Sequence, residues 1–203
     1  MAYLLAQGEA LVKAARYTID LYLKSPKFER SLIEKMLDGF EENQGVFVTL
    51  EHYPTMALRG CIGFPFPSGH IKKRLVDAAI AAATEDPRFV PVAVNELEEI
   101  VVEVNVLSPP KLVEKSAPDD RKRAVRIGRD GLMIQYGFRS GLLLPEVAIE
   151  HKWNKDEFLD SICEKAGLPK GTWKRPEVNL YTFTSQIFKE TYPEGQVKEV
   201  FLE

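Results

Sequence analysis

The order strand, strand, helix, strand occurs twice along this chain. The first set of segments occupies residues 46–50, 56–64, 71–84 and 100–107. The second set occupies residues 131–136, 141–148, 155–166 and 178–188. Alternating β-branched runs mark the strands, and apolar residues at helical spacing mark the helices. We therefore predict an α+β protein with mostly antiparallel sheets and packed helices, built from two related β-β-α-β halves at roughly residues 45–110 and 125–190.

Internal duplication has an alternative, because the two sets of segments share order and type but little residue identity. Two halves can converge on the common β-β-α-β arrangement without a shared origin. We treat residues 1–203 as one domain that can contain two subdomains.

The N-terminal segment, residues 1–24, has the pattern of an amphipathic helix. Apolar side chains recur at helical spacing from Leu4 to Leu23. Ser25-Pro26 ends the pattern, because proline disfavours helical geometry in the residue before it. Residues 27–44 are ambiguous, since they fit either a short helix that ends at Gly39 or a charged excursion on the surface.

Composition limits the classes of function. Of 203 residues, 45% are hydrophobic, which is enough for a sizeable core. Lys and Arg number 27 against 30 Asp and Glu, so no global field favours nucleic acid or an anionic membrane. The N-terminus lacks a basic lead and no run is long enough to span a bilayer, so we predict a cytoplasmic protein. Many Lys and Glu with sparse Asn and Gln are typical of a thermophilic source.

The two cysteines, Cys61 and Cys163, fall in a predicted strand and a predicted helix. This usage is typical of an intracellular protein with free thiols rather than of a secreted disulfide framework. The sequence has no CxxC pair and no Cys/His cluster, so we predict no metal site and no cofactor.

The segment Leu58–Phe64 sets one thiol between two glycines in an apolar strand. Glycine weakens a strand unless a bulge, a bend or a close approach requires it. Alternation would place Arg59 and Cys61 on one face, where the cation could lower the pKa of the thiol. We predict Cys61 and Arg59 as candidate catalytic residues, with Gly60 and Gly63 as ligand-binding positions. The alternative is that Cys61 is a small buried residue beside glycines that serve packing.

Two further residues can complete a ligand site near this segment. His70 stands at the predicted start of the helix 71–84, where a helix N-terminus favours a neutral imidazole or a bound anion. A solvent-exposed histidine without a role is the commoner case. Arg88, within Asp86-Pro87-Arg88-Phe89, can clamp an anionic ligand or can pair with a nearby acid. We predict His70 and Arg88 as ligand-binding residues and keep both alternatives.

The only basic cluster spans residues 121–126. It could contact phosphates. However, Asp119, Asp120 and Asp130 flank it and no aromatic residues interleave with it. These features are typical of a solvated loop, so we do not expect a nucleic-acid partner.

Several spaced motifs together resemble one known family. They are Leu58-Arg59-Gly60-Cys61-Ile62-Gly63, Asp86-Pro87-Arg88-Phe89 with Pro91-Val92, Gly141-Leu142-Leu143-Leu144-Pro145 with Val147-Ala148, Trp153, Phe158-Leu159, Cys163, Lys165-Ala166-Gly167-Leu168 and Trp173. On these residues, which cover most of 45–190, the chain resembles the AMMECR-type domain family. The resemblance implies an α+β fold with duplicated β-α-β units and a cytosolic or nuclear protein. The family has no firmly established reaction, but its frequent association with Memo-like and radical-SAM proteins hints at a modification pathway.

The resemblance also draws attention to Glu146. This family more often carries glutamine after Leu-Leu-Pro, so here a carboxylate replaces a neutral amide. We predict Glu146 as a ligand-binding residue.

Three functions remain open at the level of sequence. The first is a cleft around Leu58–Phe64, formed where the two halves meet, that binds a small polar or anionic molecule. The second is a Cys61-dependent group-transfer or hydrolytic enzyme. The third is a protein interaction module, which an exposed patch of Phe64, Phe66 and Phe89 would support. The partner is therefore an unknown small molecule or protein, and the sequence leaves the oligomeric state undetermined.

Overall fold

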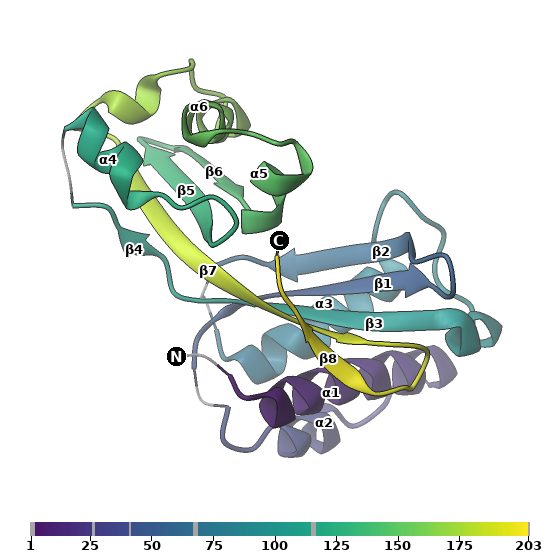
Figure 1. The fold of residues 1–203 in the computed structure, drawn as a ribbon. Helices are drawn as coiled ribbons and strands as arrows, with labels where there is room; N and C mark the ends of the chain where they lie inside the picture. Colours follow the sequence, from purple (N-terminus) through teal and green to yellow (C-terminus); the bar gives the residue numbers. More distant parts are fainter. Residues whose placement is uncertain (1–2, 26, 41, 67–68, 115–116, 203) are drawn as a thin grey trace. The chain divides into compact units, whose positions relative to one another are not determined.

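The long strand β7 (Asn179–Glu190) belongs to two structural units in the computed structural model (Figure 1). Unit 1 comprises Met1–Leu107 and Gln186–Phe201, and unit 2 comprises Ser108–Ser185 with Leu202–Glu203. The structure describes residues 3–25, 27–40, 42–66, 69–114 and 117–202. The first two residues of the predicted N-terminal segment and Pro26, which we placed after it, lie outside these ranges.

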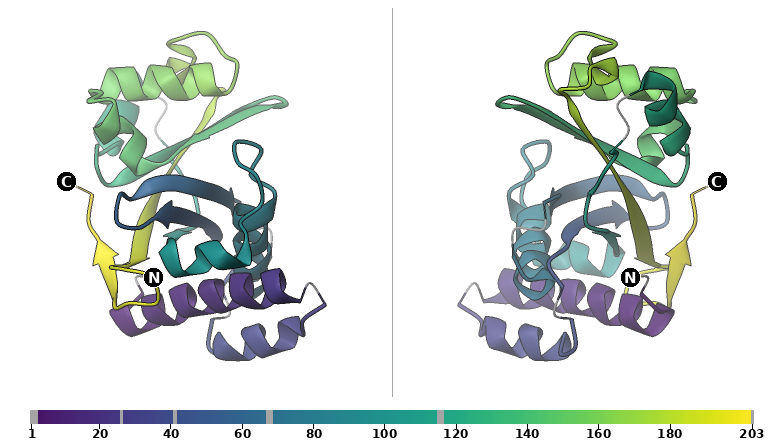
Figure 2. Two further views of the ribbon diagram at one scale, coloured as in Figure 1. Left: turned by 90° about the vertical axis from the view of Figure 1, so that its right-hand side faces the viewer. Right: turned by 90° about the vertical axis from the view of Figure 1, so that its left-hand side faces the viewer.

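Unit 1 is a twisted antiparallel sheet with helices on one side. Its elements are α1 (Leu5–Lys24), α2 (Arg30–Met36), β1 (Gly45–His52), β2 (Ala57–Phe64), α3 (Ile71–Thr84), the 3₁₀ helix η1 (Val94–Glu99), β3 (Ile100–Leu107), the end of β7 and β8 (Val197–Val200). The strand order is β2-β1-β3-β7, and β8 pairs with β7. Figure 2 shows α1 between the strands and α2.

The core of unit 1 lies between the sheet and the helices. The buried side chains that form it include Leu11, Ile19, Val48, Leu75 and Val104. They come from the apolar face of α1, from α3, and from alternate positions of the central strands, as the two periodicities require. The predicted N-terminal helix and the helix at 71–84 are both present. The ambiguous segment contains the short helix α2, and Gly39 follows it with a φ of 93° that favours glycine.

Unit 2 repeats the combination of an antiparallel sheet and helices. Its elements are β4 (Lys111–Leu112), α4 (Pro118–Ala124), β5 (Asp130–Tyr136), β6 (Arg139–Leu143), α5 (Pro145–Glu150), α6 (Lys155–Lys165), the 3₁₀ helix η2 (Thr172–Lys174) and the beginning of β7. The strand order is β7-β5-β6, and β4 pairs with β7. Its core includes Phe158, Leu159, Ile162 and Trp173.

The start of α6 is fixed locally. The Oδ1 of Asn154 accepts hydrogen bonds from the backbone N–H groups of Asp156 and Glu157, and a Glu157 oxygen accepts one from the N–H of Asn154 at 2.8 Å. This reciprocal capping satisfies donors that the first turn of a helix leaves free.

The α+β class is confirmed, and both units contain the order strand, strand, helix, strand. Gly60 in β2 and Gly141 in β6 occupy comparable positions in the two units. A Cβ on Gly60 would lie under 3.0 Å from the carbonyl oxygen of Ala82 in α3, and one on Gly141 would lie 2.9 Å from the nitrogen of Ala166 at the end of α6. Each glycine therefore lets a helix approach its strand, α3 against β2 in unit 1 and the end of α6 against β6 in unit 2. A common origin of the two halves stays a prediction.

The strand predicted at 141–148 is wrong in its second part. β6 ends at Leu143, and Pro145 begins α5. Proline suits the first helical position because its ring presets φ and the position needs no N–H donor.

Candidate functional site

A β-bulge shapes the segment between the two glycines. In the pairing of β1 with β2, Leu50 is opposite Gly60 but Glu51 is opposite Leu58, which leaves Arg59 as the extra residue. A bulge of this kind interrupts the alternation of side chains. Our prediction that Arg59 is the cation beside Cys61 is therefore wrong, and the two side chains have separate partners.

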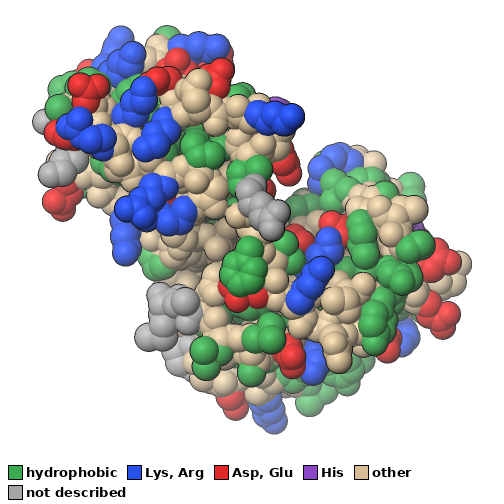
Figure 3. All heavy atoms as spheres, viewed as in Figure 1, with side chains coloured by type: hydrophobic (Ala, Val, Ile, Leu, Met, Phe, Trp, Pro, Cys, Tyr) green, Lys and Arg blue, Asp and Glu red, His purple; other side chains and the backbone are tan. Residues whose placement is uncertain are grey.

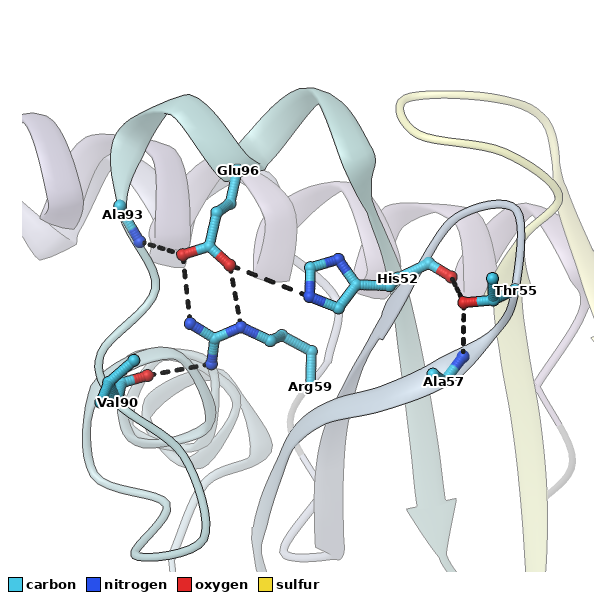
Figure 4. A network of polar contacts seen from close by, with 7 residues as sticks. All are labelled: His52, Thr55, Ala57, Arg59, Val90, Ala93 and Glu96. Atoms are coloured by element: carbon cyan, nitrogen blue, oxygen red, sulfur yellow. Dashed lines mark hydrogen bonds and ion pairs between the residues drawn. The ribbon is translucent and has the colours of Figure 1, made fainter.

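Arg59 is buried and lies in a network of polar contacts with less buried residues (Figure 4). Its Nε and Nη2 donate to the two carboxylate oxygens of Glu96 at 2.9 and 3.1 Å, and its Nη1 donates to the carbonyl of Val90 at 2.9 Å. The N–H of Ala93 also donates to Glu96, and His52 Nε2 lies 3.9 Å from the same carboxylate. The hydrogen bonds from Arg59 lower the pKa of Glu96.

The network indicates what Arg59 does in the fold. The residue is only 6% exposed, and each of its three guanidinium nitrogens has a protein partner. It thus ties the segment 90–96 to the bulge of β2. Arg59 would have to break these contacts to touch a ligand, so the geometry assigns it a positioning role, and catalysis by Arg59 stays a prediction.

Asp86 and Arg88 meet the backbone of Cys61 at the outer edge of β2. The N–H of Cys61 donates to Asp86 Oδ2 at 2.8 Å, and Arg88 Nη2 lies 3.5 Å from the Cys61 carbonyl oxygen. β2 is the last strand in the order of unit 1, so this contact covers part of an open sheet edge.

Arg88 also pairs with Asp86, as the structural alternative predicted. Its Nε and Nη2 donate to the two oxygens of Asp86 at 2.9 and 2.7 Å. The hydrogen bonds from Arg88 hold the pKa of the buried Asp86 far below its ordinary value. The Arg88 side chain is nevertheless 54% exposed, so it presents a fixed cation to solvent beside Cys61.

A row of polar side chains crosses unit 1 on the sheet face opposite α1 and α3. Thr49 in β1 is paired with both Cys61 in β2 and Glu103 in β3, so the three side chains share one face. Thr49 Oγ1 lies 3.4 Å from Cys61 Sγ. On β7, Lys189 Nζ lies 3.7 Å from Glu103 and forms an ion pair with Glu51. These five side chains are half-buried.

The environment of Cys61 favours the protonated thiol. Burial raises the pKa of Cys61, and the charges of Glu103 and Asp86 raise it further. The hydrogen bond from Thr49 and the charge of Arg88 act in the opposite direction but do not reverse the shift. This direction is opposite to the lowered pKa that a neighbouring guanidinium could have produced, and it fits the alternative of a partly buried cysteine.

His70 precedes α3 as its N-cap residue. Its side chain is exposed and forms no capping hydrogen bond. This agrees with the solvent-exposed alternative. A ligand-binding role for His70 stays a prediction.

Packing explains both glycines around the thiol. The space beside Gly60 is filled by the backbone of Ala82, and a Cβ on Gly63 would collide with the ring of Phe47 and come within 3.0 Å of the carbonyl oxygen of Val46. The glycines therefore admit neighbouring protein atoms. Ligand binding at Gly60 and Gly63 stays a prediction that concerns only their backbone groups.

Glu146 lies on α5 in unit 2, whereas the other candidate residues lie in unit 1. Burial raises the pKa of its carboxyl, and Glu150 raises it further. This half-buried carboxyl stands where the family more often carries a neutral amide, and its role in ligand binding stays a prediction.

The three phenylalanines considered as an interaction patch differ in exposure. Phe66 is 45% exposed, whereas Phe64 and Phe89 are half-buried. The Arg74 guanidinium lies 4.7 Å from the ring centre of Phe64, and Arg88 lies 5.5 Å from that of Phe89. Cations therefore cover two of the rings, which weakens the main argument for an interaction module.

The basic cluster at 121–126 is largely used inside unit 2. Arg121 is buried and donates to the carbonyls of Trp173, Arg175 and Val178. Lys122 pairs with Asp156 and Arg123 with Asp120. Most of this segment is the helix α4 rather than the predicted loop. Figure 3 shows basic and acidic side chains side by side over this part of unit 2.

Sequence reasoning missed Thr49 and Lys189. Thr49 and Glu51 alternate with buried Val48 and Leu50, which is a signal for a polar face of β1. Lys189 belongs to a strand far along the chain, and no local pattern links it to Glu103. The strand β7 itself was predicted, but its neighbour in the sheet was not.

The described residues contain neither a cluster suited to a metal ion nor a helix suited to a membrane. Within the ranges that the structure describes, no three or more His, Cys, Asp or Glu side chains are grouped to hold a metal ion. In the same part of the chain, no helix has the length and apolar character needed to cross a bilayer.

Comparisons with known proteins cover nearly the whole chain. The AMMECR1 family matches residues 12–188. A protein of Methanococcus aeolicus is 46% identical over 95% of this chain and 96% of its own length, and one of Thermococcus gammatolerans is 48% identical over 94% of each. The crystal structure of an uncharacterised protein from Pyrococcus horikoshii matches with a TM-score of 0.83 and 45% identity, covering 97% of this chain and 98% of that one.

Proposed function

This chain belongs to the AMMECR1 family, and we propose that the polar sheet face around Cys61 in unit 1 binds a small polar ligand whose anionic group contacts Arg88. The observation that supports the proposal most is the row formed by Cys61, Thr49, Glu103 and Lys189. These half-buried polar groups share one sheet face and lie beside Arg88, whose side chain is ordered by Asp86 and exposed to solvent.

The row offers complementary hydrogen-bonding groups. The Cys61 thiol and the Thr49 hydroxyl can each donate and accept, whereas Glu103 accepts and Lys189 donates. Arg88 is held in place by Asp86 and remains half exposed, so an anionic ligand group would meet a cation that is already ordered. Asp86 offsets the charge of Arg88, so recognition depends on geometry more than on net charge.

The alternative of group transfer or hydrolysis by Cys61 has one observation in its favour, which is the charge of Arg88 close to the thiol. The raised pKa opposes it, because only the thiolate is a strong nucleophile. In the proposed function the thiol lines the site and stays protonated. From the family resemblance alone, we also infer a place in a modification pathway with Memo-like and radical-SAM proteins.

The proposal is tested by titrating the ¹⁵N-labelled chain with inorganic phosphate and with succinate at constant ionic strength. We expect saturable shifts of the Cys61, Thr49 and Glu103 amide signals for at least one of these anions. Arg88→Gln should weaken that binding about tenfold, the equivalent of ~1.4 kcal/mol.

Arg30→Gln is the matched control. Arg30 is also in unit 1, is 52% exposed in its side chain and pairs with one aspartate, Asp77, but it lies outside the row. It should bind the anion as the unmodified chain does. The proposal fails if the amides of the row do not respond to either anion, or if the two variants bind equally well.

A further inference from the structure

The turn between β5 and β6 carries the most exposed large apolar side chain among the described residues, that of Phe138. Tyr136 pairs with Arg139, so Gly137 and Phe138 form a two-residue turn. The φ of Gly137 is 59°, which fits the first position of a type II′ turn. This geometry favours glycine at 137 but does not require an aromatic residue at 138. Figure 2 shows the hairpin of β5 and β6 extending beyond the helices of unit 2. We call residues 137–139 the hairpin tip.

A groove of about 330 Å³ lies in unit 1. Tyr17 lines it from α1, Met36 from the end of α2, and Glu194 from the turn between β7 and β8. The volume is at the lower end of the range for small-molecule sites, roughly 300–1,000 Å³. We call this the α1 groove.

The wall of the α1 groove suits an aromatic side chain. Tyr17 and Met36 are 42% and 41% exposed, so the wall presents an aromatic ring and a thioether to an incoming group. Aromatic rings pack favourably against both. Lys13 lines the same groove with a side chain that is 65% exposed, although it also pairs with Glu9. An ammonium group is attracted to the face of an aromatic ring.

The charges of the two units are complementary. Unit 1 contains 13 Lys and Arg against 18 Asp and Glu, whereas unit 2 contains 14 against 12. The α1 groove has the exposed carboxylate of Glu194 in its wall, and the hairpin tip has the exposed side chain of Arg139 beside Phe138. Charge therefore favours a contact between unit 2 of one copy and unit 1 of another, and opposes a contact between two copies of unit 1.

We propose that the α1 groove of one copy receives the Phe138 ring of a second copy. The ring packs against Tyr17 and Met36, and Arg139 lies toward the carboxylate of Glu194. The contact is head-to-tail because its two surfaces belong to different units, so association continues beyond two chains unless a ring of chains closes. It is separate from the site proposed around Cys61.

The unmodified chain is examined by sedimentation equilibrium at low and at physiological salt. We expect its weight-average mass to rise with protein concentration. A contact built on one aromatic side chain is small, so the Kd at low salt should be on the order of 1 mM. The association should weaken at physiological salt, because salt screens the attraction between the oppositely charged surfaces.

Variants identify the two surfaces. Phe138→Ser should weaken the association at least about tenfold, and Leu112→Ser is its control because Leu112 is a 48% exposed apolar residue of unit 2 outside the hairpin tip. Tyr17→Lys should have an equal effect, since it removes the ring from the groove and places a cation opposite Arg139. Val90→Lys adds the same charge to unit 1 at a 77% exposed position outside the groove wall, and it should leave the Kd within about twofold.

Mixing the two disabled chains tests whether the surfaces are partners. The ¹⁵N-labelled Phe138→Ser variant keeps its α1 groove, and the unlabelled Tyr17→Lys variant keeps its hairpin tip. We expect saturable shifts of amide signals in residues 13–20 and 194–195 of the labelled chain. The mass of the mixture should rise no further than that of two chains, because only one contact remains possible.

Three results would overturn the inference. They are a mass that does not rise with concentration in the unmodified chain, equal association of Phe138→Ser and Leu112→Ser, and a mixture of the disabled chains that stays monomeric. Association that is kept in Phe138→Ser but lost in Val90→Lys would assign the contact to another surface and would equally refute it. The comparison of Phe138→Ser with Leu112→Ser decides the matter even if Tyr17→Lys does not fold, since the Phe138 side chain is fully exposed.

Discussion

Replacing Gly60 by alanine tests whether this glycine serves packing. The added Cβ would lie well inside the 3.4–4 Å of ordinary van der Waals contact from the carbonyl oxygen of Ala82, and a backbone atom cannot swing aside as a flexible side chain can. Overpacking of this kind costs about 1–3 kcal/mol, and we take the upper end because backbone must move. Alanine also stabilises the fold by about 0.4–1 kcal/mol, because it restricts the unfolded chain more than glycine does. The net loss in the free energy of unfolding is therefore ~2 kcal/mol.

For a chain of this size, that loss lowers Tm by about 4–8 °C. Thermal and urea unfolding should be followed by far-UV circular dichroism for the whole chain and by tryptophan fluorescence for unit 2, because Trp153 and Trp173 both belong to unit 2. Gly69→Ala is the control, since its Cβ would meet only the flexible side chain of Arg74, at 3.4 Å, and we expect a change within about 0.5 kcal/mol. If Gly60→Ala is as stable as Gly69→Ala, the packing argument is refuted.

Asp86→Asn should lower the free energy of unfolding by about 2 kcal/mol at pH 7, where the charged hydrogen bonds of Asp86 stabilise the fold. Because the pKa of Asp86 is lowered in the folded state, this stabilisation is lost as pH falls below the ordinary aspartate pKa of about 3.8, so the difference between the variant and the unmodified chain should shrink in acid. Urea unfolding at pH 7 and at acid pH checks this, and a difference that does not change with pH would contradict it. Because the pKa of Cys61 is raised, its rate of alkylation by iodoacetamide should begin to rise at a more alkaline pH than that of a free cysteine. A rate already maximal at neutral pH would contradict the raised pKa. Glu190→Gln should cost about 3–5 kcal/mol in urea unfolding, since it leaves the buried charge of Arg16 without its counter-ion, and a loss under 1 kcal/mol would not fit. Asn154→Ala should cost about 1 kcal/mol through the lost cap of α6, again by urea unfolding, with no change expected if the cap does not form in solution.

Local signals in the sequence predict most of the elements. The helix at 71–84 follows from its apolar spacing, and the start of α6 follows from Asn154 and Glu157, because caps and periodicity depend on residues close in the chain. The start of α5 was missed because Leu144-Pro145 fits the end of a strand as well as the first turn of a helix.

The candidate site was predicted only in part, since its geometry depends on long-range pairing. Arg88 was among the predicted site residues and lies near Cys61, whereas Asp86, which accepts from the Cys61 N–H, was not. The bulge at Arg59 is invisible to strict alternation, so the wrong cation was assigned to the thiol. Lys189 reaches Glu103 only through the order of strands in the sheet, which no local pattern encodes.

The division of β7 between two units has a consequence for synthesis of the chain. Unit 1 is discontinuous, because residues 108–185 intervene between its two parts. When the ribosome has produced β3, Arg16 still lacks Glu190, and the fourth strand of its sheet does not yet exist. Apart from residues 202–203, unit 2 is contiguous from 108 to 185, so nearly all of it is synthesised before unit 1 receives its last strands. The segment synthesised first is thus the one that waits longest for its last strands, and its exposed sheet edge is the point at which a chaperone would be needed.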